Sequence, residues 1–234
     1  MPRPLLPLLL TALLPLAGCA TAELAMPSGM AATTTRYPVS GLSPHRAGEP
    51  IRFGPFSALE MREGSRFGWE LPVAGLAQLR QRWAYTQVAP GQMPVESQCQ
   101  ARARMLRHAD AHGALQLDLD DAAGRPVLAC GFRLDDGRLL TLELQRDGHA
   151  LQGRLHAPDG DFEIRSLHAL RGTPLASGTA LGYALTRAGK TVLVVDRVNA
   201  GAVAMAEPLD EGQRMGLAAA ASALLLFDPE FGEG

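Results

Sequence analysis

The sequence predicts a mainly β domain of the α+β class: a curved antiparallel meander sheet, as a partial barrel or sandwich, with a C-terminal helix packed against it. Three observations predict this fold. Apolar and polar residues alternate along much of the chain, turn signals recur about every dozen residues, and the last segment changes to an Ala/Leu-rich helical composition.

Two segments show the strand pattern most clearly. In residues 115–119 and 140–145, leucines alternate with polar side chains, as in strands with one face in the core and one in water. Turn signals of the Asp-Gly type follow at Asp136-Gly137, Asp147-Gly148 and Asp159-Gly160. Further strands are predicted at residues 66–71, 80–88, 97–105, 128–134, 179–186, 190–198 and 202–206. The continuous apolar run at 192–195 predicts a strand that is covered on both faces.

The C-terminal segment predicts one helix at about residues 210–227. Asp210 is a suitable N-cap, Glu211 suits the first turn, and nearly every following position is apolar. A helix that is apolar nearly all round is buried, so we expect it to plug or cover the sheet. Asp228-Pro229 ends the helix, and residues 229–234 form a tail.

The first eighteen residues have the features of an export signal: one early charge at Arg3 and an apolar run that is too short to span a bilayer. Their last residues and the next one form Leu16-Ala17-Gly18-Cys19, which resembles the lipobox of bacterial lipoproteins. The resemblance implies cleavage before Cys19, a thioether-linked diacylglycerol on its sulfur, and an acylated amine. Membrane lipid is then the partner of Cys19, since several acyl chains make a permanent anchor. The alternative is an ordinary secretory signal that is cut after Ala20 or Ala22.

The resemblance also implies a location, because Ala20 stands where an Asp would indicate retention in the inner membrane. We expect a lipid-anchored protein of the outer membrane that faces the periplasm. The Ala-, Thr-, Ser-, Pro- and Gly-rich residues 19–50 predict a flexible tether spanning roughly 30 Å. A single β-rich domain is then expected at 51–228.

The remaining cysteines, Cys99 and Cys130, are predicted to form a disulfide. Both occupy apolar positions of alternating strands, and exported proteins meet an oxidising compartment. The alternative is two separately buried thiols.

His108 and His112 are the candidate metal ligands, since a helix would place them on one face at i and i+4. No third ligand is evident nearby, and a solvated polar turn is the alternative. We therefore expect no metal and no cofactor.

Arg102, Arg104 and Arg107 predict a basic stripe on the outer face of one strand. Such a stripe could bind an anionic headgroup or polymer. The alternative is cross-strand pairing with the acidic residues Asp118 and Asp120.

Composition and motifs narrow the function. The net charge of −2 argues against a nucleic-acid partner, and no nucleophile elbow or phosphate loop is present. We expect a non-enzymatic binding or scaffold protein of the cell envelope, with an envelope protein as possible partner. A first alternative is a carrier of an apolar or lipid ligand, since a curved sheet crossed by a helix resembles half-barrel lipoproteins that carry acyl chains. A second is a metal-dependent hydrolase that uses the two histidines.

Overall fold

The computed structural model describes residues 22–30, 33–42, 49–64, 66–71, 75–110 and 113–232. Along the chain the strands are β1 (Thr34–Ser40), β2 (Ile51–Phe53), β3 (Phe56–Glu63), β4 (Phe67–Leu71), β5 (Leu76–Val88), β6 (Val95–Asp110), β7 (Gly113–Asp118), β8 (Leu128–Arg133), β9 (Leu139–Asp147), β10 (Ala150–His156), β11 (Phe162–Leu167), β12 (Gly182–Arg187), β13 (Lys190–Asp196) and β14 (Ala202–Ala206). Two helices complete the fold, the single turn α1 (Leu119–Ala122) and the long α2 (Glu211–Leu226).

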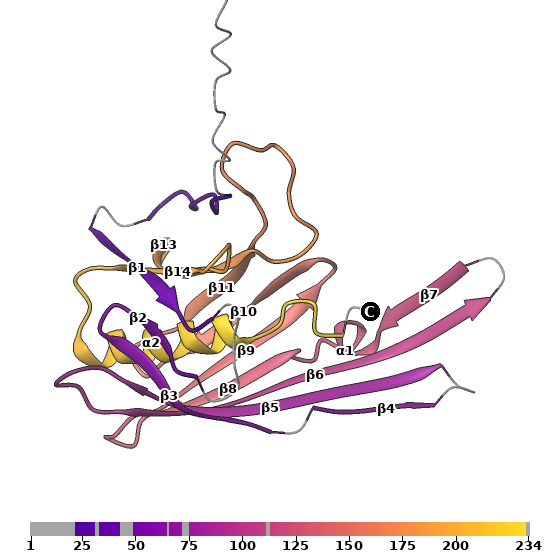
Figure 1. Ribbon diagram of the computed structural model, residues 1–234, viewed down its shortest axis with the longest axis horizontal. Helices are drawn as coiled ribbons and strands as arrows, with labels where there is room; N and C mark the ends of the chain where they lie inside the picture. Colours follow the sequence, from indigo (N-terminus) through magenta and orange to yellow (C-terminus); the bar gives the residue numbers. More distant parts are fainter. Residues whose placement is uncertain are drawn as a thin grey trace, which may run out of the picture.

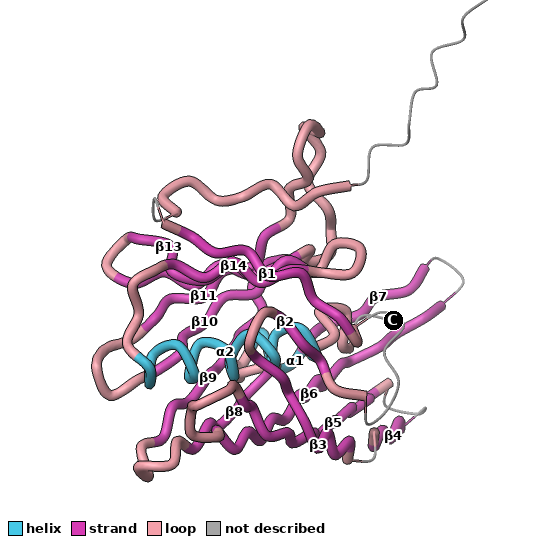
Figure 2. Tube along the Cα trace, turned by 60° about the vertical axis from the view of Figure 1, so that its left-hand side comes forward, coloured by secondary structure: helices cyan, strands magenta, loops and turns pink. Residues whose placement is uncertain are grey.

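Twelve of the described strands form a closed antiparallel barrel (Figures 1 and 2). Around the barrel they follow the order β5-β3-β2-β1-β14-β13-β12-β11-β10-β9-β8-β6, and the ring closes because β6 pairs with β5 from Leu76 to Gln87. The mainly β, antiparallel prediction is confirmed. The prediction of a partial barrel or sandwich is wrong, because alternation reveals strands but not which two of them close a ring.

The alternating strands are oriented as the pattern predicts. Leu140, Leu142 and Leu144 of β9 point into the barrel and are buried, whereas Glu143 and Gln145 between them face outward. The same alternation in β6 and β8 places further apolar side chains in the core, and most of the buried side chains that line the interior are apolar.

Helix α2 lies inside the barrel (Figure 2). It contacts β3, β5, β6, β8 and β13, and every residue from Met215 to Leu225 is buried. The run Ala218–Ala221 keeps the middle of the helix narrow enough to be enclosed. Asp210 is the N-cap, as predicted: its carboxylate accepts a hydrogen bond from the Gln213 amide at 2.8 Å.

Two buried hydrogen bonds hold this helix to β5. The Tyr85 hydroxyl donates to the carbonyl of Ala219 at 2.5 Å, and the Ser222 hydroxyl donates to the side-chain oxygen of Gln87 at 2.6 Å. Burial raises the pKa of Tyr85, so this phenol remains a hydrogen-bond donor.

The C-terminal residues after α2 lie against one end of the barrel. Arg146 points inward from β9 and donates hydrogen bonds to the carbonyls of Pro229 at 3.0 Å and Phe231 at 3.4 Å. The guanidinium also lies 3.7 Å from Asp118. This buried arginine therefore joins the tail to the wall, and Phe231 is buried there with it.

The predicted tether at residues 19–50 is wrong for most of its described part. β1 is a barrel strand between β14 and β2, and residues 22–30 pack on the outside of the wall. Leu24 is 1% exposed and lies in a cluster with Ala184, Val194 and Ala204 of β12, β13 and β14. The composition rich in small and polar residues predicted a flexible segment, but such residues also form a strand when neighbouring strands offer hydrogen-bond partners, as β14 and β2 do for β1.

The predicted disulfide is present. Cys99 and Cys130 are directly paired residues of β6 and β8, with Cα atoms 4.1 Å apart and the sulfur atoms 2.09 Å apart. Both side chains are buried on the inner face, as alternation predicts. The bridge therefore links adjacent strands of the closed wall.

A four-stranded extension continues past the barrel on one side (Figure 1). It consists of β4, the first part of β5, the last part of β6, and β7, and we call it the wing. Among the described strands, β4 pairs only with β5, and β7 pairs only with β6. The face of the wing that continues the outer wall of the barrel carries the even-numbered residues of β5 and β6.

Candidate functional site

The residues that the sequence singles out are placed as follows. Cys19 and His112 lie outside the described residues. His108 belongs to β6, which runs to Asp110, so His108 does not lie on the helix that would align the two histidines. Among the described residues, no group of three or more His, Cys, Asp or Glu side chains could hold a metal ion.

Four arginines gather instead on the outer face of the wing, where it leaves the barrel. In the register of β5 and β6, Arg80 stands directly opposite Arg102, and Gln78 stands opposite Arg104. Residues that face each other across a strand pair point to the same side of the sheet. Together with Arg125, Asp120 and Pro126, these residues line a surface pocket of about 280 Å³.

The turn after α1 brings Arg125 to this pocket. The Arg125 amide donates to the Asp120 carbonyl at 2.8 Å, and Gly124 takes a φ of +61°, a conformation that favours glycine. The chain therefore reverses direction directly after α1, and the side chains of Asp120 and Arg125 line the same pocket.

Within the described part of the chain, only Arg104 of these four arginines has a carboxylate partner. Arg104 donates from Nε to Asp120 at 2.8 Å, and the Asp120 side chain is only 5% exposed. Arg104 therefore pairs with the acidic segment as predicted, but the pairing is not cross-strand, because Asp120 belongs to the helical turn α1. Asp118, the other predicted partner, faces the interior and Arg146.

The other three arginines, Arg80, Arg102 and Arg125, have no carboxylate partner among the side chains that the structure describes. The Nε of Arg80 is buried and has no hydrogen-bond partner within the described part of the chain. The pocket thus concentrates positive charge with one carboxylate for four arginines, and the Nε of Arg80 lacks a partner, an arrangement suited to an anion.

Exposed apolar side chains share this face. Phe67 and Trp69 of β4 stand opposite Arg80 and Gln78, and are 60% and 37% exposed. Further along, the paired residues Leu106 and Leu117 of β6 and β7 are 39% and 48% exposed. Of the seven large apolar side chains that are exposed in the described chain, four therefore lie on one face of the wing. We call this surface, with the four arginines, the wing surface.

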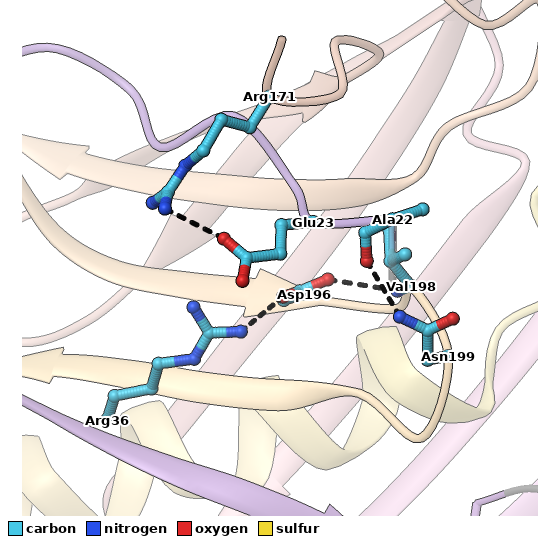
Figure 3. A network of polar contacts seen from close by, with 7 residues as sticks. All are labelled: Ala22, Glu23, Arg36, Arg171, Asp196, Val198 and Asn199. Atoms are coloured by element: carbon cyan, nitrogen blue, oxygen red, sulfur yellow. Dashed lines mark hydrogen bonds and ion pairs between the residues drawn. The ribbon is translucent and has the colours of Figure 1, made fainter. Parts of the chain in front are cut away.

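The opposite side of the barrel carries a polar network around the N-terminal segment (Figure 3). Arg171 pairs with Glu23 at 2.8 Å, Arg36 pairs with Asp196 at 2.8 Å, and the Asn199 side chain donates to the Ala22 carbonyl at 2.7 Å. These contacts fix the start of the described chain on the wall.

Asp196 lies at the centre of this network and is mostly buried. Its carboxylate accepts a hydrogen bond from the Val198 amide at 2.9 Å, in addition to the ion pair with Arg36. Burial raises the pKa of Asp196 above its ordinary value, because desolvation outweighs both of these contacts.

A second groove, of about 480 Å³, lies on the outer face of β9, β10 and β11. Its lining mixes both signs of charge, with Glu143 and Glu163 beside Arg154 and Arg165. Arg165 and Glu163 lie 3.5 Å apart. This groove is charge-balanced and lacks the apolar border of the wing surface.

In comparisons with known proteins, no protein-family model, curated protein or solved structure matches the chain. Within the described chain, no helix combines the length and apolar character required to cross a membrane. Function is therefore argued from the surface itself.

Part of this surface was visible in the sequence. Alternation placed Arg102 and Arg104 outward, but Arg107 lies where no side chain is described. Arg80, Phe67 and Trp69 were missed as site residues. Residues 66–71 were predicted as a strand, but the sequence did not show which strand lies beside β4.

Proposed function

We propose that this protein is a lipid-anchored binding protein of the bacterial cell envelope, which acts through its wing surface and catalyses no reaction. The anchor is Cys19, in the lipobox-like Leu16-Ala17-Gly18-Cys19. It holds the protein at the outer membrane, facing the periplasm.

The observation that carries the binding role is the composition of the wing surface. Arg80 and Arg102, which have no carboxylate partner among the described side chains, lie beside exposed aromatic and aliphatic side chains on a single sheet face. Exposed apolar side chains that gather together mark interaction sites on soluble domains. Arginine and aromatic residues are the types that contribute most to binding energy.

The barrel interior supports this role in preference to a carrier. A ligand carrier needs internal space, and here α2 fills the inside with buried side chains from Met215 to Leu225. Binding is therefore assigned to the outer surface.

The anchor is tested by intact-mass measurement and membrane fractionation of the native protein. We expect the mass of a chain that begins at an acylated Cys19, and release into the soluble fraction for Cys19→Ser. A native product with an unmodified Cys19, or one that begins after it, contradicts the anchor.

The binding role is tested by chemical cross-linking in cells at normal expression. We expect a defined cross-linked product, with either a protein or a lipid, for the natural chain and its loss for the double variant Phe67→Ser and Trp69→Ser. The matched control is Leu175→Ser, since Leu175 is 77% exposed and lies outside the wing. A product that all three proteins give equally contradicts a role for the wing surface.

A further inference from the structure

The wing surface and the start of the described chain lie on opposite sides of the barrel. In the ring of twelve strands, β5 and β6 are diametrically opposite β12 and β13. Residues 22–30 pack on the outside of β12, β13 and β14. In both views this segment lies across the barrel from β5 (Figures 1 and 2).

The connection between Cys19 and the barrel is short. Ala22 already accepts a hydrogen bond from Asn199, and Leu24 is buried against the wall. Three peptide units from Cys19 to Ala22 reach about 11 Å at full extension. A lipid on Cys19 therefore holds the β12–β14 side of the barrel close to its own membrane.

The wing surface cannot lie flat on that same membrane while the N-terminal segment stays docked. A helix with its side chains is about 10–12 Å wide. Opposite walls of a barrel that encloses one are then on the order of 20 Å apart. This separation exceeds the reach of the three-residue connection, so the wing surface faces away from the anchored membrane.

The chemistry of the wing surface fits an anionic lipid bilayer. Arg80, Arg102 and Arg125 supply positive charge without carboxylate partners among the described side chains. Phe67 and Trp69 border them with exposed aromatic rings, the residue type that occupies the headgroup level of membranes. Binding at a membrane surface combines buried apolar area with attraction to anionic lipid, and both elements are present on one face.

We propose that the wing surface docks on a second, anionic phospholipid membrane, so that the lipid-anchored protein bridges two bilayers. This inference rests on the proposed function, because the bridge needs the lipid on Cys19.

The test uses the full lipidated protein, reconstituted into phosphatidylcholine donor vesicles. Labelled acceptor vesicles contain either phosphatidylglycerol or phosphatidylcholine alone, and donor–acceptor tethering is measured by fluorescence cross-correlation. We expect tethering of the phosphatidylglycerol vesicles only, and its decrease as salt screens the charges.

Variants locate the contact. A basic residue near an anionic surface contributes about 1 kcal/mol, or about fivefold in affinity, so Arg80→Gln with Arg102→Gln should weaken tethering about 25-fold. Phe67→Ser with Trp69→Ser should abolish it. The matched controls, Arg165→Gln and Leu175→Ser, should tether like the natural protein, because both residues are exposed and lie outside the wing.

The outcomes separate the two proposals. Failure of the protein to enter donor vesicles for want of a lipid overturns the proposed function and the bridge together. Entry without tethering overturns the bridge alone, and so does equal tethering of both acceptors. Tethering that survives the loss of Phe67 and Trp69 also overturns it, because charge alone would then be recognised. Cross-linking of the wing surface to a protein without tethering assigns the surface to a protein partner instead.

Discussion

Arg80 of β5 faces Arg102 of β6 directly across the strand pair, and neither has a carboxylate partner among the side chains that the structure describes. Like charges in this position destabilise a sheet, so the pair opposes folding. A stability cost of this kind is expected at a surface that functions in binding. Because the facing arginines affect folding, the wing surface can be tested by measuring the free energy of unfolding as well as by measuring binding.

Replacing one of these arginines should stabilise the protein. Arg102→Gln removes the repulsion and should raise the free energy of unfolding by about 0.2–1 kcal/mol, measured by urea denaturation at low salt. The gain should shrink in high salt. The control is Arg82→Gln, since Arg82 faces the neutral Gln100 and its replacement should change stability little. A loss of stability in Arg102→Gln would show that this arginine has a structural role.

Loss of the disulfide should destabilise the barrel. The bridge joins residues that are 31 positions apart. In the chain-entropy description it contributes about 3–4 kcal/mol. We expect the double variant Cys99→Ala and Cys130→Ala to unfold at correspondingly lower denaturant, with or without reductant. Reductant should affect only the natural chain, and an unchanged midpoint would mean that the cysteines are not bridged in solution.

The buried face of α2 should tolerate little change. Leu224 is 0% exposed inside the barrel, so Leu224→Ala should cost about 2–5 kcal/mol of unfolding free energy. Leu175→Ala on the surface should stay within about 0.5 kcal/mol of the natural chain. Similar small effects of both changes in thermal unfolding would argue against a helix enclosed by the barrel.

The N-terminal segment should behave as part of the domain. Leu24→Ala should lower the unfolding free energy by about 2–5 kcal/mol, because Leu24 packs against Val194 and Ala204. Ala22→Ser, at an exposed position, should have almost no effect. Proteolysis of the folded protein should also spare residues 22–30 in the natural chain. Rapid cleavage there would restore the tether interpretation and lengthen the connection to Cys19.

Asp196 should make stability depend on pH. Its folded pKa is raised above the ordinary value of 3.8 by burial, so the ionised carboxylate is disfavoured in the folded state. The natural chain should therefore lose stability relative to Asp196→Asn as pH rises from about 3.8 through the folded pKa. Denaturation of both proteins across this range measures the difference. A difference that grows in favour of the natural chain would mean that Arg36 dominates and holds the pKa below its ordinary value.

Much of the fold could be predicted because a strand that is buried on one face alternates apolar and polar residues with a period of two. Leu142 and Cys130 were assigned inward from alternation alone, and Asp210 was assigned as a cap from its position before an apolar helix. The run 192–195 predicted a strand covered on both faces. Leu193, Val194 and Val195 are fully buried, and residues 22–30 cover the outer side.

The remainder depended on strand pairing, which a single sequence does not encode locally. Apolar and polar residues do not alternate in Thr34–Ser40, and a proline such as Pro38 disfavours a strand. The segment nevertheless forms strand β1, because Pro38 lies where the pairing passes from β14 to β2. The clustering of Arg80 with Arg102 likewise required the register of β5 and β6. For this reason the sequence predicted the part of the wing surface that β6 contributes, but not the parts from β4 and β5.

Site-resolved photo-cross-linking in living cells tests the role of the wing surface most directly. A photo-reactive amino acid replaces Trp69 in one strain and Leu175 in another, with the leader and Cys19 unchanged. We predict an abundant adduct from position 69, which disappears when Arg80→Gln and Arg102→Gln are added, and none from position 175. Equal labelling at the two positions, or none at 69, would contradict a binding role for this face of the barrel.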